Sequence, residues 1–257
     1  MSKWKHINLV YLYDETFEGF LSIVFDCYKN KIIPSDIKSK YKYNINFLEQ
    51  ALEIESSLEK ATRVYNGIIN LASYQTFYIC FTAFLNSATD KEINILKYII
   101  HALEVSDKVN SMLTVPYILY VQKLSKNTLF EAHRLKGLLR FVSIENNIYY
   151  ASIHPDNLVL ELLAKHFIKR LPTERFIIHD KKRNLALLYN SNSYTIIDAS
   201  TLNLPPLSEE ELRYQKLWKT FFNTITIKER KNPRLQMQFM PKKYWVDLVE
   251  LNNNAAS

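Results

Sequence analysis

The sequence predicts an α+β fold, in which an antiparallel sheet of hairpin and meander strands carries a helical insertion of about four or five helices. Apolar residues recur at helical spacing from about residue 47 to residue 136, whereas short β-branched and aromatic runs alternate with polar turns after residue 138. These patterns divide the chain into three segments. They are 1–46, an N-terminal strand and helix of the α+β core; 47–137, a helical block; and 138–257, an α+β C-terminal portion with a basic and aromatic tail.

The N-terminal segment is expected to begin with a strand at 6–13, which is rich in β-branched and aromatic residues. Asp14 or Thr16 then caps a helix, because a short oxygen-bearing side chain can accept from the free N–H groups of the first turn. A polar connection rich in Lys and Tyr is expected from 33 to 46. The apolar residues of the helix follow i, i+3 and i+4 spacing: Phe17, Phe20, Leu21, Val24 and Phe25.

The second segment is expected to be helical throughout. Thr89 with Glu92 matches a capping box and predicts a helix start. Pro116 predicts another, since proline is tolerated in a first helical turn. The residues that recur near helical spacing at the beginning of the segment are Phe47, Ala51, Leu52, Ile54, Leu58, Ala61 and Val64.

The C-terminal portion begins with a predicted hairpin, whose two halves flank Glu145-Asn146-Asn147. Pro155-Asp156 is expected to start a helix. Strand-like runs separated by polar turns predict an antiparallel meander of 175–179, 185–189 and 194–198. Ser208 with Glu211 forms a second capping box, before a helix that carries Leu217, Trp218, Phe221 and Phe222.

Composition excludes several classes of protein. Three glycines, with neither GxGxxG nor GxxxxGK[ST], argue against Rossmann and P-loop nucleotide sites. Cys27 and Cys80 are expected to be buried thiols of a cytoplasmic protein, and the first residues lack the apolar region of a signal peptide. The uncharged stretch 64–89 contains too many polar residues for a membrane span. No metal motif such as HExxH occurs, so neither a metal nor a cofactor is expected.

Positive charge is concentrated late in the chain. Residues 161–257 hold 16 Lys and Arg against 10 Asp and Glu, whereas residues 1–160 hold 17 against 16. The chain has nine arginines, and eight of them lie at or after Arg134. An AT-rich genome would enrich Lys but not Arg, so the arginines favour selection for polyanion binding.

The run from Lys228 to Trp245 interleaves cations with aromatic rings, which suits phosphates and exposed bases. The alternative is a solvated tail held by one hydrophobic anchor. Candidate nucleic-acid-binding residues across the C-terminal half are Arg134, Lys136, Arg183, Arg230, Lys231, Arg234, Lys242, Lys243, Tyr244 and Trp245.

Three clusters contain an imidazole beside charged groups: 131–140, 154–156 and 179–183. The candidate catalytic residues are His133, His179 and Asp180, with Asp180 orienting His179 and His133 acting as a second acid or base. We expect His133, Arg134, His179, Asp180 and Arg183 to line one pocket. The alternative is that His179-Asp180 only closes the turn between two strands, while Arg134 pairs with a helix carboxylate.

These clusters resemble the motifs of a bacterial family assigned to DNA metabolism and DNA repair. The likeness is most specific in the C-terminal segment and around His133. The matching residues are Tyr13-Asp14, Phe17-Glu18-Gly19-Phe20-Leu21, His133-Arg134-Leu-Lys136-Gly137, Arg140-Phe141, Pro155-Asp156, His166-Phe167, Arg170, His179-Asp180, Arg183, Arg230, Asn232-Pro233-Arg234-Leu235-Gln236, Gln238-Phe239-Met240-Pro241-Lys242 and Tyr244-Trp245.

The resemblance implies a DNA context and a partner. Genes of that family typically lie beside one for a radical-SAM protein, and some relatives are fused to a uracil-DNA-glycosylase-like domain. We therefore expect a DNA-repair or DNA-processing accessory protein that binds nucleic acid through its basic C-terminal half and acts with a radical-SAM protein. Two alternatives stay open: an enzyme acting on a nucleobase or phosphodiester through a His/Asp/Arg site, and a protein-interaction scaffold without direct DNA contact.

Overall fold

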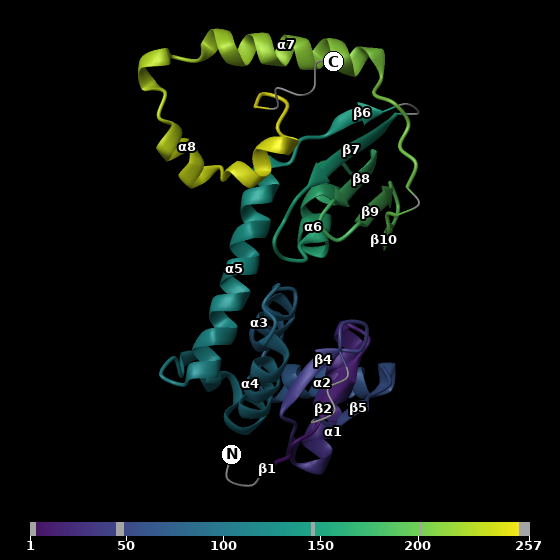
Figure 1. Ribbon diagram of the computed structural model, residues 1–257, viewed down its shortest axis with the longest axis vertical. Helices are drawn as coiled ribbons and strands as arrows, with labels where there is room; N and C mark the ends of the chain where they lie inside the picture. Colours follow the sequence, from purple (N-terminus) through teal and green to yellow (C-terminus); the bar gives the residue numbers. More distant parts are fainter. Residues whose placement is uncertain (1–3, 45–48, 145–146, 201, 252–257) are drawn as a thin grey trace. The chain divides into compact units, whose positions relative to one another are not determined.

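A computed structural model describes residues 4–44, 49–144, 147–200 and 202–251, which form a mixture of helices and sheets. The chain divides into two compact units, Met1–Leu129 (unit 1) and Phe130–Ser257 (unit 2). Helix α5 (Pro116–Leu138) begins in unit 1 and ends in unit 2, and Figure 1 shows the elements of each unit. Its start at Pro116 is as predicted.

The sheets of unit 1 are parallel. β2 is flanked by β4 and β5, while β1 pairs with β3. The sequence predicted neither β4, within the expected polar connection, nor β5, where a helix was expected. These short strands are stabilised by pairing with the mostly buried β2 and not by a pattern of their own. The strands are β1 (Lys5–His6), β2 (Val10–Tyr13), β3 (Ile32–Ile33), β4 (Asp36–Ser39) and β5 (Ala51–Glu53).

Helix α1 (Phe17–Asn30) begins as predicted, with Thr16 as its N-cap. The Thr16 hydroxyl accepts a hydrogen bond from the Gly19 backbone N–H at 2.9 Å. Asp14 contributes indirectly, because one of its carboxylate oxygens accepts from the Thr16 hydroxyl at 2.6 Å. A Cβ atom at Gly19 would lie 2.3 Å from that oxygen, so a larger residue there would displace the Asp14 carboxylate from Thr16.

The capping box predicted at Thr89 is wrong. Helix α4 has Asp90 at its N-cap position, without a capping hydrogen bond from the side chain. Glu92 is buried and accepts a hydrogen bond from the Tyr13 hydroxyl at 2.8 Å, so a tertiary contact uses the side chain that the box would need. The remaining helical elements of unit 1 are α2 (Leu58–Leu71), α3 (Tyr74–Phe84), α4 (Lys91–Val105) and the 3₁₀ helix η1 (Ser106–Ser111).

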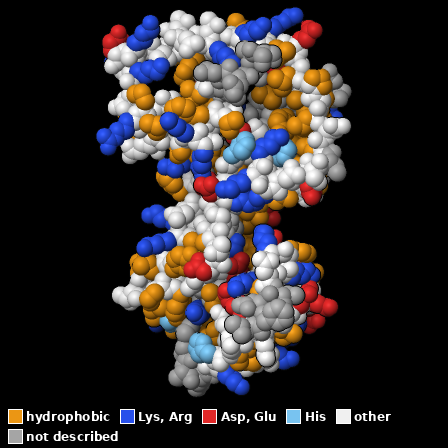
Figure 2. All heavy atoms as spheres, in the orientation of Figure 1, with side chains coloured by type: hydrophobic (Ala, Val, Ile, Leu, Met, Phe, Trp, Pro, Cys, Tyr) orange, Lys and Arg blue, Asp and Glu red, His pale blue; other side chains and the backbone are white. Residues whose placement is uncertain are grey.

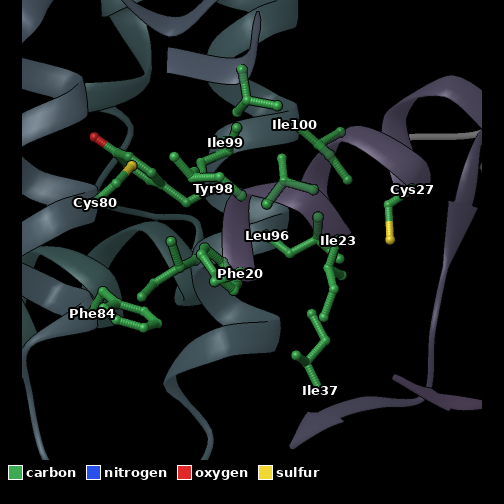
Figure 3. Close-up of a cluster of buried hydrophobic side chains, with 14 of the residues drawn as sticks. Phe20, Ile23, Cys27, Ile37, Cys80, Phe84, Leu96, Tyr98, Ile99 and Ile100 are labelled. Atoms are coloured by element: carbon green, nitrogen blue, oxygen red, sulfur yellow. The ribbon is translucent and has the colours of Figure 1, made fainter. Parts of the chain in front are cut away.

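The core of unit 1 joins α1 to the helices that follow it. Figure 3 shows Phe20 and Ile23 of α1 beside Leu96 of α4, and all three side chains are fully buried. Cys27 and Cys80 are free and buried, as the sequence predicted. Burial raises the pKa of the Cys27 thiol to about 12, with a further contribution from Asp26, so this thiol is a packing residue and not a nucleophile.

Unit 2 contains one sheet with the strand order β10-β9-β8-β7-β6. The predicted hairpin and the predicted meander are both present and antiparallel. The tip of the hairpin at 145–146 lies outside the described residues. The strands are β6 (Val142–Ile144), β7 (Ile148–Ile153), β8 (Arg175–Asp180), β9 (Leu185–Asn190) and β10 (Tyr194–Asp198).

The sheet is mixed, which corrects the expectation of a purely antiparallel one. β7 and β8 run parallel, with Ser152 opposite His179 and Ile153 opposite Asp180. A parallel pair needs a crossover connection, and helix α6 (Leu160–Arg170) provides it. This helix begins later than the predicted Pro155-Asp156 start.

The two faces of this sheet differ. Phe176 and Ile178 of β8 join Leu163 and Phe167 of α6 in one hydrophobic cluster. On the opposite face, Ile177 packs with Ala199 and with residues of the connector that follows β10. Polar side chains at the carboxyl ends of β7 and β8 therefore lie at the edge of a rigid, well-packed support.

The C-terminal segment begins with helix α7, whose N-cap is Ser208, as predicted. The Ser208 hydroxyl accepts from the Glu211 backbone N–H at 3.1 Å, while the Glu211 carboxylate accepts from the Ser143 N–H and so attaches the helix to β6. No helix in the described part of the chain is long and apolar enough to span a membrane. The segment comprises α7 (Glu209–Ile225), η2 (Lys228–Arg230), α8 (Pro233–Phe239) and η3 (Lys242–Asp247).

Candidate functional site

Two polar loops meet at one edge of the unit 2 sheet. Because β7 and β8 are parallel neighbours, their carboxyl ends lie at the same edge, where α/β proteins commonly place ligands. The loop after β7 carries His154, Asp156 and Asn157, and the turn after β8 carries Lys182 and Arg183. Figure 2 shows His side chains beside Lys and Arg side chains on unit 2.

Glu131 of α5 is the centre of the hydrogen-bond network at this edge. One of its oxygens accepts from the Asp156 N–H at 2.8 Å, the Lys243 ammonium at 2.7 Å and the Tyr244 hydroxyl at 2.9 Å. The other accepts from the N–H of Asn157 at 2.8 Å and from its side-chain amide at 2.7 Å. These backbone bonds hold the loop after β7 in place and explain why α6 starts after it.

Burial alone would raise the pKa of Glu131. The hydrogen bond from Lys243, those from the backbone of Asp156 and Asn157, and that from Tyr244 outweigh burial and lower it below its ordinary value. Lys243 also pairs with Asp156, and Asp156 pairs with Lys182 at 3.0 Å. Glu131 is therefore an ionised, buried carboxylate that fastens η3 to the strand ends.

Asp180 organises the turn after β8. Its side chain is completely buried, and one oxygen accepts from the backbone N–H groups of Lys182 at 3.0 Å and Arg183 at 3.2 Å. The other oxygen pairs with the Arg183 guanidinium at 2.9 Å. The same guanidinium donates to the carbonyl oxygens of Pro155 and Asp156, so it joins the two loops.

An Asp–His pair lies beside this network. His154 Nδ1 is 2.9 Å from an Asp247 oxygen, and the Ser152 hydroxyl donates to the other Asp247 oxygen at 2.6 Å. A carboxylate on Nδ1 favours a proton there, which leaves Nε2 of His154 as a proton acceptor. The His154 side chain is 38% exposed, so a ligand can reach it.

His179 of β8 lies opposite Ser152 of β7, so the two side chains are neighbours on one face of the sheet. Its Nδ1 lies 3.1 Å from the Tyr150 hydroxyl, and its buried Nε2 makes no hydrogen bond with any described residue. Burial, followed by the charge of Lys181, lowers the pKa of His179, with a smaller lowering from His154 and opposition from Asn184 and Asp180. His179 is therefore neutral near pH 7, and its Nε2 lies inside the fold, out of reach of a ligand in this structure.

The structure places five of the candidate residues in or beside this network: His179, Asp180, Arg183, Lys243 and Tyr244. Asp180 closes the turn, as one of the alternatives expected. His133 is exposed on α5 and makes no hydrogen bond with a described residue. Arg134 lies over the Phe130 ring at 4.3 Å and donates to the Gln238 carbonyl, so it does not pair with a helix carboxylate.

The other candidates lie outside the network. Lys136 is close enough for its charge to lower the pKa of His166, after the larger effect of burial. The Trp245 indole donates to the Met240 carbonyl at 2.8 Å. The remaining candidates are exposed: Arg230, Lys231, Arg234 and Lys242.

Sequence reasoning did not select some residues of the site. Glu131, His154 and Asp156 stood in the clusters singled out above but were not chosen as site residues. Asp247 and Glu250 had no local signal, because their partners His154 and Arg140 are about a hundred positions away in the sequence. Among the described residues, no three His, Cys, Asp or Glu side chains are grouped to hold a metal ion.

Unit 2 is thus a mixed α/β module with a buried acidic centre and an Asp–His pair at the ends of parallel strands. Residues 89–250, more than half of the chain, match the family described as domain of unknown function DUF4130, and the chain belongs to this family. The match begins just before α4 and ends at Glu250, so it includes the whole network. No curated protein matches the sequence at a significant level.

Proposed function

We propose that this protein binds nucleic acid through the segment 228–243. The observation that supports this best is a set of exposed cations whose side chains make no hydrogen bond or ion pair with another described residue. Cations that the fold leaves unpaired are available to phosphates. They are Arg230, Lys231, Arg234 and Lys242.

The segment is anchored and not a loose tail. Asn232 caps α8 by accepting from the Leu235 N–H at 3.0 Å, and Pro233 occupies the first turn. At the far end, Tyr244 is buried and bound to Glu131. The cations are therefore presented from a backbone of defined shape, which lowers the entropic cost of binding.

The proposed role is that of a DNA-repair or DNA-processing accessory protein, in line with the motif resemblance. The same resemblance proposes a radical-SAM protein as partner. Co-expression of the two proteins and affinity purification, with and without nuclease treatment, tests the partnership. Independent elution under both conditions would leave DNA binding as the whole proposal.

Binding to single-stranded DNA should weaken steeply as salt rises. Each phosphate contact contributes about −0.7 to the slope of log affinity against log salt, so four contacts predict a slope near −2.8. Fluorescence anisotropy with a labelled oligonucleotide, from low to moderate salt, measures it. Arg234→Glu and Arg230→Glu should each make the slope shallower by about 0.7.

The matched control is Lys29→Glu, which makes the same change of charge at an exposed position in unit 1. It should leave the affinity unchanged. The melting temperatures of the Arg230 and Arg234 variants should equal that of the wild type, because these side chains are exposed. A protein that binds no oligonucleotide at low salt would exclude the proposal, as would an Arg234→Glu variant that fails to fold.

A second candidate is an enzyme that acts on a nucleobase or phosphodiester. It is favoured by the His154–Asp247 pair, because His154 is 38% exposed and its Nδ1 is occupied by Asp247, which leaves Nε2 for a ligand. With His154 as a proton acceptor, His154→Gln should reduce turnover by about a hundredfold or more. Electrophoresis and mass spectrometry of oligonucleotides incubated with the protein detect cleavage or base change; no product with stoichiometric wild-type protein would remove this candidate.

A further inference from the structure

Helix α7 exposes an apolar stripe. None of its residues, all of which the structure describes, is buried. In contrast, the apolar side of α1 is largely inaccessible to solvent. The stripe follows i, i+3, i+4 and i+7 spacing and consists of Tyr214, Leu217, Trp218, Phe221 and Ile225, between 42% and 64% exposed.

Polar contacts hold this helix on unit 2 although its apolar face is uncovered. At its start, Ser208 and Glu211 bind Ser143 of β6. In its middle, the Trp218 indole donates to the Glu250 carboxylate at 3.2 Å, and Glu250 also pairs with Arg140. The stripe therefore lies on a helix that is attached to unit 2, and Figure 1 shows α7 and α8 as two separate helices joined by the connection that contains η2.

The composition of the stripe indicates what it binds. Three of its five members are aromatic, and the Trp218 and Phe221 rings lie 5.8 Å apart at 32°. The exposed Phe239 ring lies on α8, within the segment that carries the unpaired cations. Acidic residues occupy only the first turn of α7, whereas the aromatic residues lie further toward the end that leads into Lys228. Figure 2 shows cationic and apolar side chains interspersed over unit 2.

We infer that the α7 stripe stacks the bases of single-stranded nucleic acid whose phosphates contact the cations of segment 228–243. This inference rests on the proposed function and adds strand preference and base stacking to it. Duplex DNA keeps its bases stacked inside the helix, so it cannot use the rings. Unstacked bases on aromatic side chains gain affinity without regard to sequence, and the adjoining positive charge favours this occupant over an apolar protein helix.

The test compares three labelled probes of equal length: an intact single strand, an abasic single strand and a duplex. The wild type should bind the intact strand more tightly than the abasic strand, by about fivefold or more for each ring engaged. Phe221→Leu and Tyr214→Leu keep an apolar side chain but lose the ring, so each should lower affinity for the intact strand by about fivefold and leave the abasic strand unaffected. Leu217→Ala is the control on the same stripe and should change neither affinity.

Each other outcome has a distinct meaning. Equal binding of intact, abasic and duplex probes, with the salt dependence retained, would overturn the stacking inference and leave the proposed function standing. Equal losses in Leu217→Ala and Phe221→Leu would also overturn it, because general apolar contact would then explain the effect. A dimer in light scattering that Leu217→Asp dissociates would assign the stripe to a second copy of the chain. No binding of any probe would exclude both proposals.

Discussion

Glu131→Ala should lower the free energy of unfolding of unit 2 by about 3–5 kcal/mol, the range for removing one partner from a buried, hydrogen-bonded ion pair. Its carboxylate receives five hydrogen bonds, from Asp156, Asn157, Lys243 and Tyr244. Two of these donors are backbone N–H groups of the loop after β7. Their loss should also free the loop that carries the candidate site.

Glu131→Gln should be nearly as damaging, although it keeps the shape of the side chain. All five groups that bond to the Glu131 carboxylate are hydrogen-bond donors. The NH₂ group of a glutamine would also be a donor, so in either orientation of the amide it would face donors that it cannot bind. We expect a cost of about 2–3 kcal/mol from the unsatisfied groups. Wild-type stability in this variant would contradict the central role of the carboxylate. Glu210→Gln, at an exposed position of α7, is the matched control and should cost less than about 0.5 kcal/mol.

Tryptophan fluorescence during urea unfolding measures these changes in unit 2. Trp4 is the single tryptophan of the sequence of unit 1, so a Trp4→Phe background confines the signal to Trp218 and Trp245. The pH dependence provides a second check. Because the folded-state pKa of Glu131 is lowered, its contribution is complete above the unfolded pKa and is lost as pH falls through the folded value. The difference between wild type and Glu131→Gln should therefore shrink below about pH 4.

The sequence predicted elements that local chemistry determines. Thr16 and Ser208 cap their helices as expected, and Pro116 begins α5, because each signal acts within one turn. The capping box predicted at Thr89 does not form, because the Glu92 side chain that it needs accepts a buried hydrogen bond from Tyr13, which lies 79 positions away in the sequence. Short parallel strands such as β4 were not predicted either. They are stabilised by pairing with a strand distant in the sequence, and a local pattern does not show this pairing.

In the candidate site, too, local contacts could be predicted and contacts between residues distant in the sequence could not. His179, Asp180 and Arg183 stand close together in the sequence, and the turn after β8 keeps them together. The contact of Glu131 with Lys243 joins residues 112 positions apart, and no spacing rule predicts it. Lys243 and Tyr244 were selected as nucleic-acid ligands from the local alternation of cations and aromatic rings in 228–245, whereas their bonds to Glu131 depend on how η3 packs against the strand ends.

Asp180→Ala should lower the stability of unit 2 by about 3–5 kcal/mol, because it removes the buried partner of Arg183 and the acceptor of two backbone N–H groups. Arg183→Ala should cost less, about 2–3 kcal/mol, since its guanidinium is partly exposed and its loss leaves the turn bonds of Asp180 intact. Lys182→Ala is the control. Its pair with Asp156 is more than half exposed on both sides, so the change should stay within about 0.5 kcal/mol.

The double variant distinguishes a shared network from two independent contacts. If Arg183 acts on stability through Asp180, the double variant should be little worse than Asp180→Ala alone, with a coupling free energy of about 1–3 kcal/mol. Strictly additive losses would show that Arg183 stabilises the fold through the carbonyl oxygens of Pro155 and Asp156 instead. In that case Arg183 would still join the two loops, but the buried carboxylate would serve the turn after β8 alone, and the Asp180–Arg183 pair would be removed from the candidate site.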